Sequence, residues 1–209
     1  MTPSFISYEG MVISILVMAI IGTLLLLALV LSRMVRLRRE SIDAERIKPL
    51  RPLLLEIASG EDDDGSAAQQ LADVRGAARP LVVDAALRLL AKVKGQPAAA
   101  LTELLGALGV PERIKNDLYS SSEVKRAHAA WDAGLMGLSD RVVDLIKLLD
   151  DHSGTVRLTS VRALGKLGNP VATPGVLAAA ADRGRHAGIS APVVVEALMG
   201  LGPEAADTI

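Results

Sequence analysis

The sequence predicts an all-α protein in which a single N-terminal transmembrane helix precedes a solenoid of short helices. Two observations support this fold class. Residues 10–32 contain no charged side chain over 23 positions; as a helix they span ~35 Å at ~1.5 Å per residue, which exceeds the ~30 Å hydrocarbon core of a bilayer. The rest of the chain divides into apolar segments of helical period separated by glycine and proline, with no alternating run long enough for a strand.

The charges around the apolar run favour a membrane anchor over a cleavable signal peptide. A signal peptide carries its positive charge before the apolar core, whereas here only Glu9 precedes the run and arginines follow it. Cytoplasmic flanks of membrane helices carry an excess of Lys and Arg. We therefore expect residues 1–9 outside and everything after the helix in the cytoplasm, with Phe5 and Tyr8 at the headgroup level. The basic residues expected at the membrane surface are Arg33, Arg36, Arg38 and Arg39.

The distribution of charge argues against a general nucleic-acid surface. Residues 33–52 have a net charge of +4 within a chain whose total is −1, and residues 53–209 carry −4. A nucleic-acid surface needs basic residues across the soluble part, so the basic segment is interpreted as a topology determinant that also attracts anionic lipid headgroups. The chain has no cysteine, which excludes disulfides and thiolate zinc sites. Its Ala-, Arg- and Val-rich composition indicates a bacterial source, and hence the plasma membrane.

The apolar segments are predicted to form short helices that pair into repeats. The expected helices are 50–59, 80–94, 98–108, 111–119, 123–136, 140–149, 155–167, 171–181 and 192–201. The residues of 163–168 recur in part 34 positions later at 197–202, and Val124-Lys125 stands 32 positions before Val156-Arg157. A period of about 30 to 34 residues with two helices each is typical of helical-repeat proteins.

At residues 151–157 and 163–170 the sequence resembles a HEAT repeat, the helical-hairpin unit of one class of α-solenoids. The resemblance implies that Val156-Arg157 opens the first helix, that Ala-Leu-Gly packs against neighbouring helices, and that Gly168-Asn169 turns into the second helix. Trp131 and Asp132 stand where the repeat has Ala-Leu, so we expect different packing there. Armadillo-type and other helical repeats stay open as alternatives.

The expected organisation follows from these segments. It comprises an extracytoplasmic N-terminus (1–9), the transmembrane helix (10–32), a basic juxtamembrane segment (33–52), hairpins of weak repeat character (53–122) and HEAT-like repeats (123–209). The last repeat is expected to be incomplete, with its open end belonging to a longer chain or covered by a partner.

No catalytic, cofactor or metal site is predicted. His128, His152 and His186 fall in different repeats and lack ligand spacing. The acid run Glu61–Ser66 lacks the spacing of a calcium loop and is interpreted as a solvated linker. No phosphate-binding glycine loop or serine nucleophile elbow is present. We therefore expect a non-enzymatic protein.

Within the apolar run, small residues recur at four-residue spacing, which allows membrane helices to approach closely. The residues expected to pack in this way are Gly10, Ser14, Ala19 and Thr23.

The predicted function is that of an adaptor or scaffold, since solenoids present extended binding surfaces. The expected partner is an integral membrane enzyme or transporter, such as a glycosyltransferase or a secretion component. The residues expected to bind it along the solenoid ridge are Lys125, Arg126, Trp131, Arg157, Arg162 and Lys166. A self-associating membrane scaffold is the alternative, and a pigment-attachment enzyme similar to the HEAT-like bilin lyases is a further one.

Overall fold

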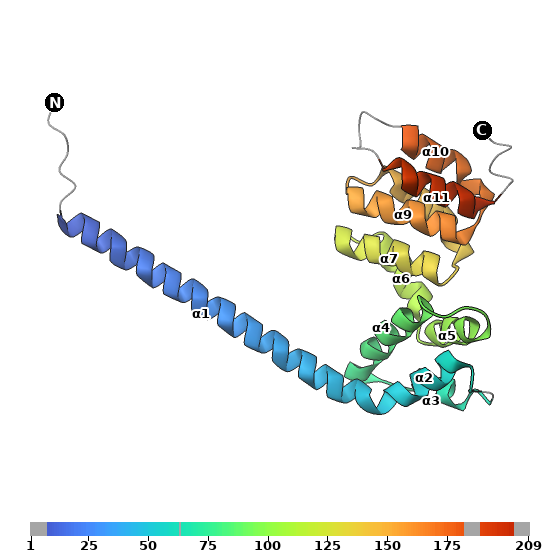
Figure 1. Ribbon diagram of the computed structural model, residues 1–209, viewed down its shortest axis with the longest axis horizontal. Coiled ribbons are helices and arrows are strands. Elements are labelled where there is room, and N and C mark those ends of the chain that lie inside the picture. The colour runs from blue at the N-terminus through green and yellow to red at the C-terminus, as the bar shows by residue number, and fades with distance from the viewer. Residues whose placement is uncertain (1–7, 63, 182–188, 203–209) are drawn as a thin grey trace. The chain divides into compact units, whose positions relative to one another are not determined.

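The computed structural model describes residues 8–62, 64–181 and 189–202, and in these ranges every regular element is helical. The chain divides into two compact units, Met1–Pro49 and Leu50–Ile209. The fold class is therefore the expected one: an all-helical chain with one long apolar helix near its N-terminus (Figure 1).

The first unit consists mainly of α1 (Tyr8–Ile47). Within it, Ile13–Met34 is long and apolar enough to cross a membrane, with a mean hydropathy of 2.9 and no buried side chain. The hydroxyls of Ser14 and Thr23 donate to the carbonyls of Gly10 and Ala19, at 2.9 and 2.8 Å. Such bonds satisfy polar groups inside the helix itself, as an apolar solvent requires.

The helix α1 also includes much of the predicted basic segment. Its backbone stays helical to Ile47 without a break after the apolar run. Arg33 is exposed, while the side chains of Arg36, Arg38 and Arg39, like residues 1–7, lie outside the described part of the chain.

The second unit contains the helical repeats and ten α-helices in its described residues. They are α2 (Arg51–Ser59), α3 (Ser66–Ala72), α4 (Arg79–Leu90), α5 (Gln96–Ala107), α6 (Val110–Leu118), α7 (Glu123–Leu135), α8 (Val142–Lys147), α9 (Gly154–Leu167), α10 (Thr173–Ala181) and α11 (Ala191–Leu201). Short 3-10 turns join several of them: η1 (Lys48–Leu50), η2 (Gly76–Ala78), η3 (Ser139–Arg141), η4 (Leu148–Asp150) and η5 (Pro170–Ala172). Proline stands at the first or second position of α2, α4, α5, α6 and α11. At these positions its ring fixes φ, and the missing N–H group costs no intrahelical hydrogen bond.

Two described residues of the acid run, Asp62 and Asp64, contact the start of α3, which the interpretation as a solvated linker did not include. The Asp62 carboxylate accepts hydrogen bonds from the N–H groups of Ala67 and Ala68, both at 3.0 Å, and Asp64 accepts one from the N–H of Ser66. These bonds satisfy free N–H groups at the start of α3, and α3 packs against α2 and α5. The seven residues of α3 are too few to show a helical period, so the sequence does not predict this helix.

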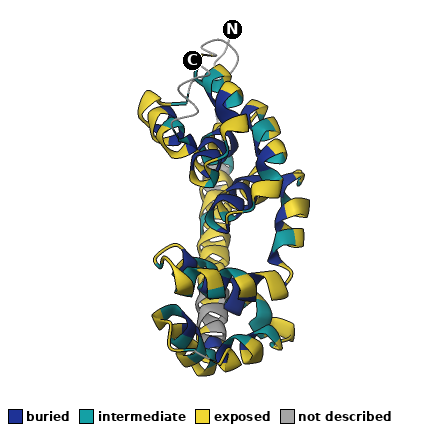
Figure 2. Ribbon diagram, turned by 90° about the vertical axis from the view of Figure 1, so that its right-hand side faces the viewer, coloured by how far each residue is buried: buried dark blue, intermediate teal, exposed yellow. Residues whose placement is uncertain are grey.

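The HEAT-like region has two layers of helices. α7, α9 and α11 lie side by side in one layer, as Figure 1 shows, while α8 and α10 pack on α9 and α11 from the other side. Each helix turns a buried stripe toward its neighbours and an exposed stripe outward (Figure 2). The segment expected as one helix over 140–149 is instead η3, α8 and η4 in succession.

Glycines set the close spacing of the layer formed by α7, α9 and α11. A Cβ atom on Gly134 would lie 2.7 Å from Ala163 Cα, and one on Gly165 would lie 2.6 Å from Ala197 Cα. Both distances are far below van der Waals contact, so only glycine allows these backbones to approach. The same glycine-to-alanine contact thus joins α7 to α9 and α9 to α11.

Candidate functional site

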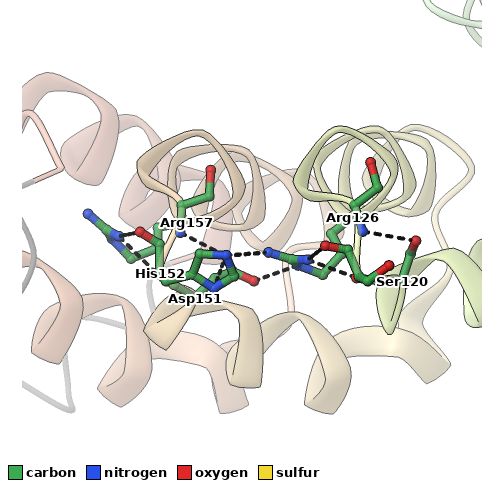
Figure 3. Close-up of polar contacts among 8 residues, drawn as sticks. Ser120, Arg126, Asp151, His152 and Arg157 are labelled. Carbon is green, nitrogen blue, oxygen red and sulfur yellow. Dashed lines mark hydrogen bonds and ion pairs between the residues drawn. The ribbon is translucent and has the colours of Figure 1, made fainter.

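A buried arginine joins the start of α7 to the turn before α9. Arg126 donates through Nε and Nη2 to the Asp151 carboxylate, at 2.7 and 2.9 Å, and through Nη1 to the carbonyls of Ser120 and Ser121. Figure 3 shows this network, in which the His152 ring lies beside the guanidinium. Paired, charge-assisted bonds of this kind fix geometry as well as adding energy.

Arg157 repeats part of this arrangement one repeat later. Its Nη1 atom contacts the carbonyls of Asp151 and His152, which stand six and five residues before it. Ser120 and Ser121 stand at the same two separations from Arg126. The structural offset between the repeats is therefore 31 residues, and Lys125-Arg126 corresponds to Val156-Arg157, not Val124-Lys125 as the sequence offset of 32 suggested.

The expectation that Arg126 and Arg157 lie on an exposed binding ridge does not fit the structure. Their exposed fractions are 6 and 5 %, and their guanidiniums bind the turns of the solenoid. Burial tends to raise the pKa of Asp151, but the bonds from Arg126 and from the Ser153 N–H outweigh it and hold that pKa below its usual value. The pair is thus a structural link between repeats.

The remaining predicted ridge residues do lie on the outer surface of the α7, α9 and α11 layer. Lys125, Arg162 and Lys166 are exposed, and Trp131 is 38 % exposed. With the structural offsets of 31 and 34 residues, Trp131, Arg162 and Glu196 occupy the same position on α7, α9 and α11. The single tryptophan of the chain is therefore at the surface. The expectation that Trp131 and Asp132 take the place of the Ala-Leu pair is one residue off, because at the offset of 31 Trp131 corresponds to the exposed Arg162 and Asp132 to Ala163.

A pocket of about 400 Å³ adjoins the tryptophan, and we call it the Trp131 pocket. It is lined by Trp131, Arg162, Gly165, Lys166, Glu196, Ala197 and Gly200. The Lys166 ammonium lies over the indole, 3.9 Å from the ring centroid, in a cation–π contact. Burial lowers the pKa of Lys166, partly opposed by the charge of Glu196. Two of the lining residues, Gly165 and Gly200, carry no side chain.

A second cleft, of about 460 Å³, is also lined by Trp131, and we call it the α4–α7 cleft. Its walls come from α4, α6 and α7. They combine apolar side chains with charged ones, namely Asp84, Arg88, Arg113, Asp117, Lys125, His128 and Asp132. Asp84 pairs with Arg88, and Asp132 lies 3.5 Å from Arg113. Trp131 lines both hollows.

Asp132 should make stability depend on pH. Burial raises its pKa to about 6, although Arg113 and His128 oppose the shift. The folded pKa lies above the unfolded value of about 3.9, so ionisation of Asp132 is less favourable in the folded state than in the unfolded state. The unfolding free energy therefore falls as pH rises from about 4 to 6. The unfolding free energy of the wild type relative to Asp132→Asn should fall by roughly 2 kcal/mol over this interval. Urea unfolding of both proteins in detergent at several pH values measures this change. A difference in unfolding free energy between the two proteins that stays constant with pH would contradict the raised pKa of Asp132.

The histidines do not converge on a metal site in the described residues. His128 lines the α4–α7 cleft and His152 lies beside Arg126, while His186 lies outside the described residues. Across the described ranges no group of three His, Cys, Asp or Glu side chains is placed to hold a metal ion.

Comparison with known proteins identifies the repeats. No curated protein matches the chain. Residues 110–191 match the family model for HEAT repeats. The match starts at the first residue of α6 and ends at the first residue of α11, so it includes the arginine network and most of the surface around Trp131. The chain is thus a helical-repeat protein with HEAT-like repeats.

Proposed function

We propose that this protein is a non-enzymatic, membrane-anchored scaffold whose repeats bind a protein partner through the surface around Trp131. The observation that carries the proposal is that the only tryptophan of the chain lines two hollows of the solenoid. Tryptophan and arginine are enriched at the energetic centres of protein interfaces, and a layer of successive helices offers an extended surface.

The apolar segment of α1 supplies the anchor in this proposal. Ile13–Met34 is long and apolar enough to cross a bilayer, and the arginines that follow favour a cytoplasmic location for the repeats at the plasma membrane. They also suit contact with anionic headgroups. Attachment to the membrane raises the effective concentration of the repeats near other membrane proteins, which supports an integral membrane enzyme or transporter as the partner.

Site-specific photocrosslinking in native membranes tests the proposal. A photoreactive amino acid is placed at Glu196, an exposed residue that lines the Trp131 pocket, or at Val171, an exposed residue of η5 outside both hollows. We expect position 196 to give a defined adduct with a membrane protein that is identified by mass spectrometry, and Trp131→Ala to reduce its yield. An adduct with a second copy of this chain would instead support the self-associating scaffold.

A further inference from the structure

The two hollows beside Trp131 differ in how their cations are paired. In the α4–α7 cleft, Arg88 pairs with Asp84, and Arg113 lies within 4 Å of Asp132. In the Trp131 pocket, neither Arg162 nor Lys166 forms an ion pair with a carboxylate among the described residues. The Trp131 pocket therefore holds two cations that form no ion pair among the described residues, although the charge of Glu196 acts on Lys166.

The environment of Lys166 adds to this imbalance. Its ammonium lies against the indole of Trp131 and is partly desolvated, which lowers its pKa. Glu196 is the only acidic residue that lines the pocket, and it lies too far from both cations to form an ion pair. A carboxylate placed between Arg162 and Lys166 would gain charge-assisted hydrogen bonds to both.

The shape of the pocket suits a side chain that enters from a peptide. The small residues Gly165, Ala197 and Gly200 are among those that line it, and a volume of about 400 Å³ accommodates a side chain but not a folded element. An aromatic ring and two cations among the lining residues favour a ligand with both a carboxylate and an apolar stem.

We propose that the Trp131 pocket binds an acidic peptide segment of the partner, with a Glu or Asp carboxylate between Arg162 and Lys166. This inference rests on the proposed function and specifies the chemistry of the partner at the same surface. The complementary charges commit the proposal to a protein segment rich in Glu and Asp. Nucleic acid, which is also anionic, is one outcome of the test.

The test uses fluorescein-labelled hexaglutamate and the full-length protein in an uncharged detergent at low salt. Binding is followed by fluorescence anisotropy, and the emission of Trp131, the only tryptophan, locates it. We expect saturable binding that changes Trp131 emission and weakens steeply with added salt. The variant Arg162→Glu/Lys166→Glu should bind at least tenfold more weakly. Lys92→Glu, a charge reversal at an exposed residue outside both hollows, should bind as the wild type does.

Several outcomes would overturn the inference. The arginines of residues 33–39 also attract anions, so binding without a change in Trp131 emission, or binding that survives Arg162→Glu/Lys166→Glu, would place the peptide elsewhere. Equal binding of hexalysine, or much tighter binding of a uridine decanucleotide, would reject an acidic peptide as the ligand. If photocrosslinking at position 196 still captures a protein in those cases, only the acidic segment is refuted and the scaffold proposal stands.

Discussion

Gly165→Ala should destabilise the helical repeats by about 3 kcal/mol. The new Cβ atom would lie 2.6 Å from Ala197 Cα and 3.1 Å from Ala197 Cβ. Ala197 Cα is a backbone atom, so a rotamer change cannot relieve this contact, and α9 and α11 must move apart. Urea unfolding of the full-length protein in detergent, followed by Trp131 fluorescence, measures the loss.

The matched control is Gly106→Ala in α5, where the added Cβ atom meets nothing within 4 Å. Alanine is the better helix former, so this variant should be unchanged or more stable by about 0.5–1 kcal/mol. Equal effects of the two substitutions would show that the close approach of α9 and α11 is not required.

Arg126→Met should lower the melting temperature by roughly 5–10 °C. The substitution leaves the Asp151 carboxylate, whose side chain is 7 % exposed, without its cation, and leaves the carbonyls of Ser120 and Ser121 without this donor. Removing one member of a buried pair is far more costly than removing both. Thermal unfolding monitored by circular dichroism in detergent measures the change.

Two comparisons separate this effect from simple loss of charge. Lys125→Met removes a positive charge from the neighbouring exposed residue and should change the melting temperature by no more than about 2 °C. The double variant Arg126→Met/Asp151→Asn should recover part of the loss, since the neutral amide is cheaper to bury. Arg126→Met and Lys125→Met with equal melting temperatures would refute a structural role for Arg126.

Much of the fold could be predicted from the sequence because its signals are local. Residues 10–32 form one uncharged run, and the breaker pairs at Gly109-Val110-Pro111 and Gly168-Asn169-Pro170 separate helices as expected. The missed helix α3 depends on the Asp62 carboxylate, which reaches the N–H groups of residues five and six positions ahead. A capping contact across a turn leaves no periodic pattern to detect.

The candidate site could be predicted only in part. Arginine at 126 and 157 has the same charge as arginine at 162, yet the first two are buried and the third is exposed. Arg126 and Arg157 differ from Arg162 in two ways: each has carbonyl acceptors on the turn before its helix, and each occupies a different position in the repeat. The offset of 32 taken from the sequence places the repeats one residue away from the structural offset of 31. The contacts of Gly134 and Gly165 with alanine fix the structural offset, and they can be read only from packed helices.

The most direct test of the account compares photocrosslinking yields from the two sides of the repeats. The yield of the partner adduct from position 196 should exceed that from position 171 by about tenfold or more, since crosslinkers react only with groups in contact, and Trp131→Ala should remove most of it because aromatic anchors dominate interface energies. Tyr119→Ala, at an exposed aromatic outside both hollows, should leave the yield unchanged. Equal yields from positions 196 and 171, or a yield unaffected by Trp131→Ala, would contradict the claim that the Trp131 surface binds the partner.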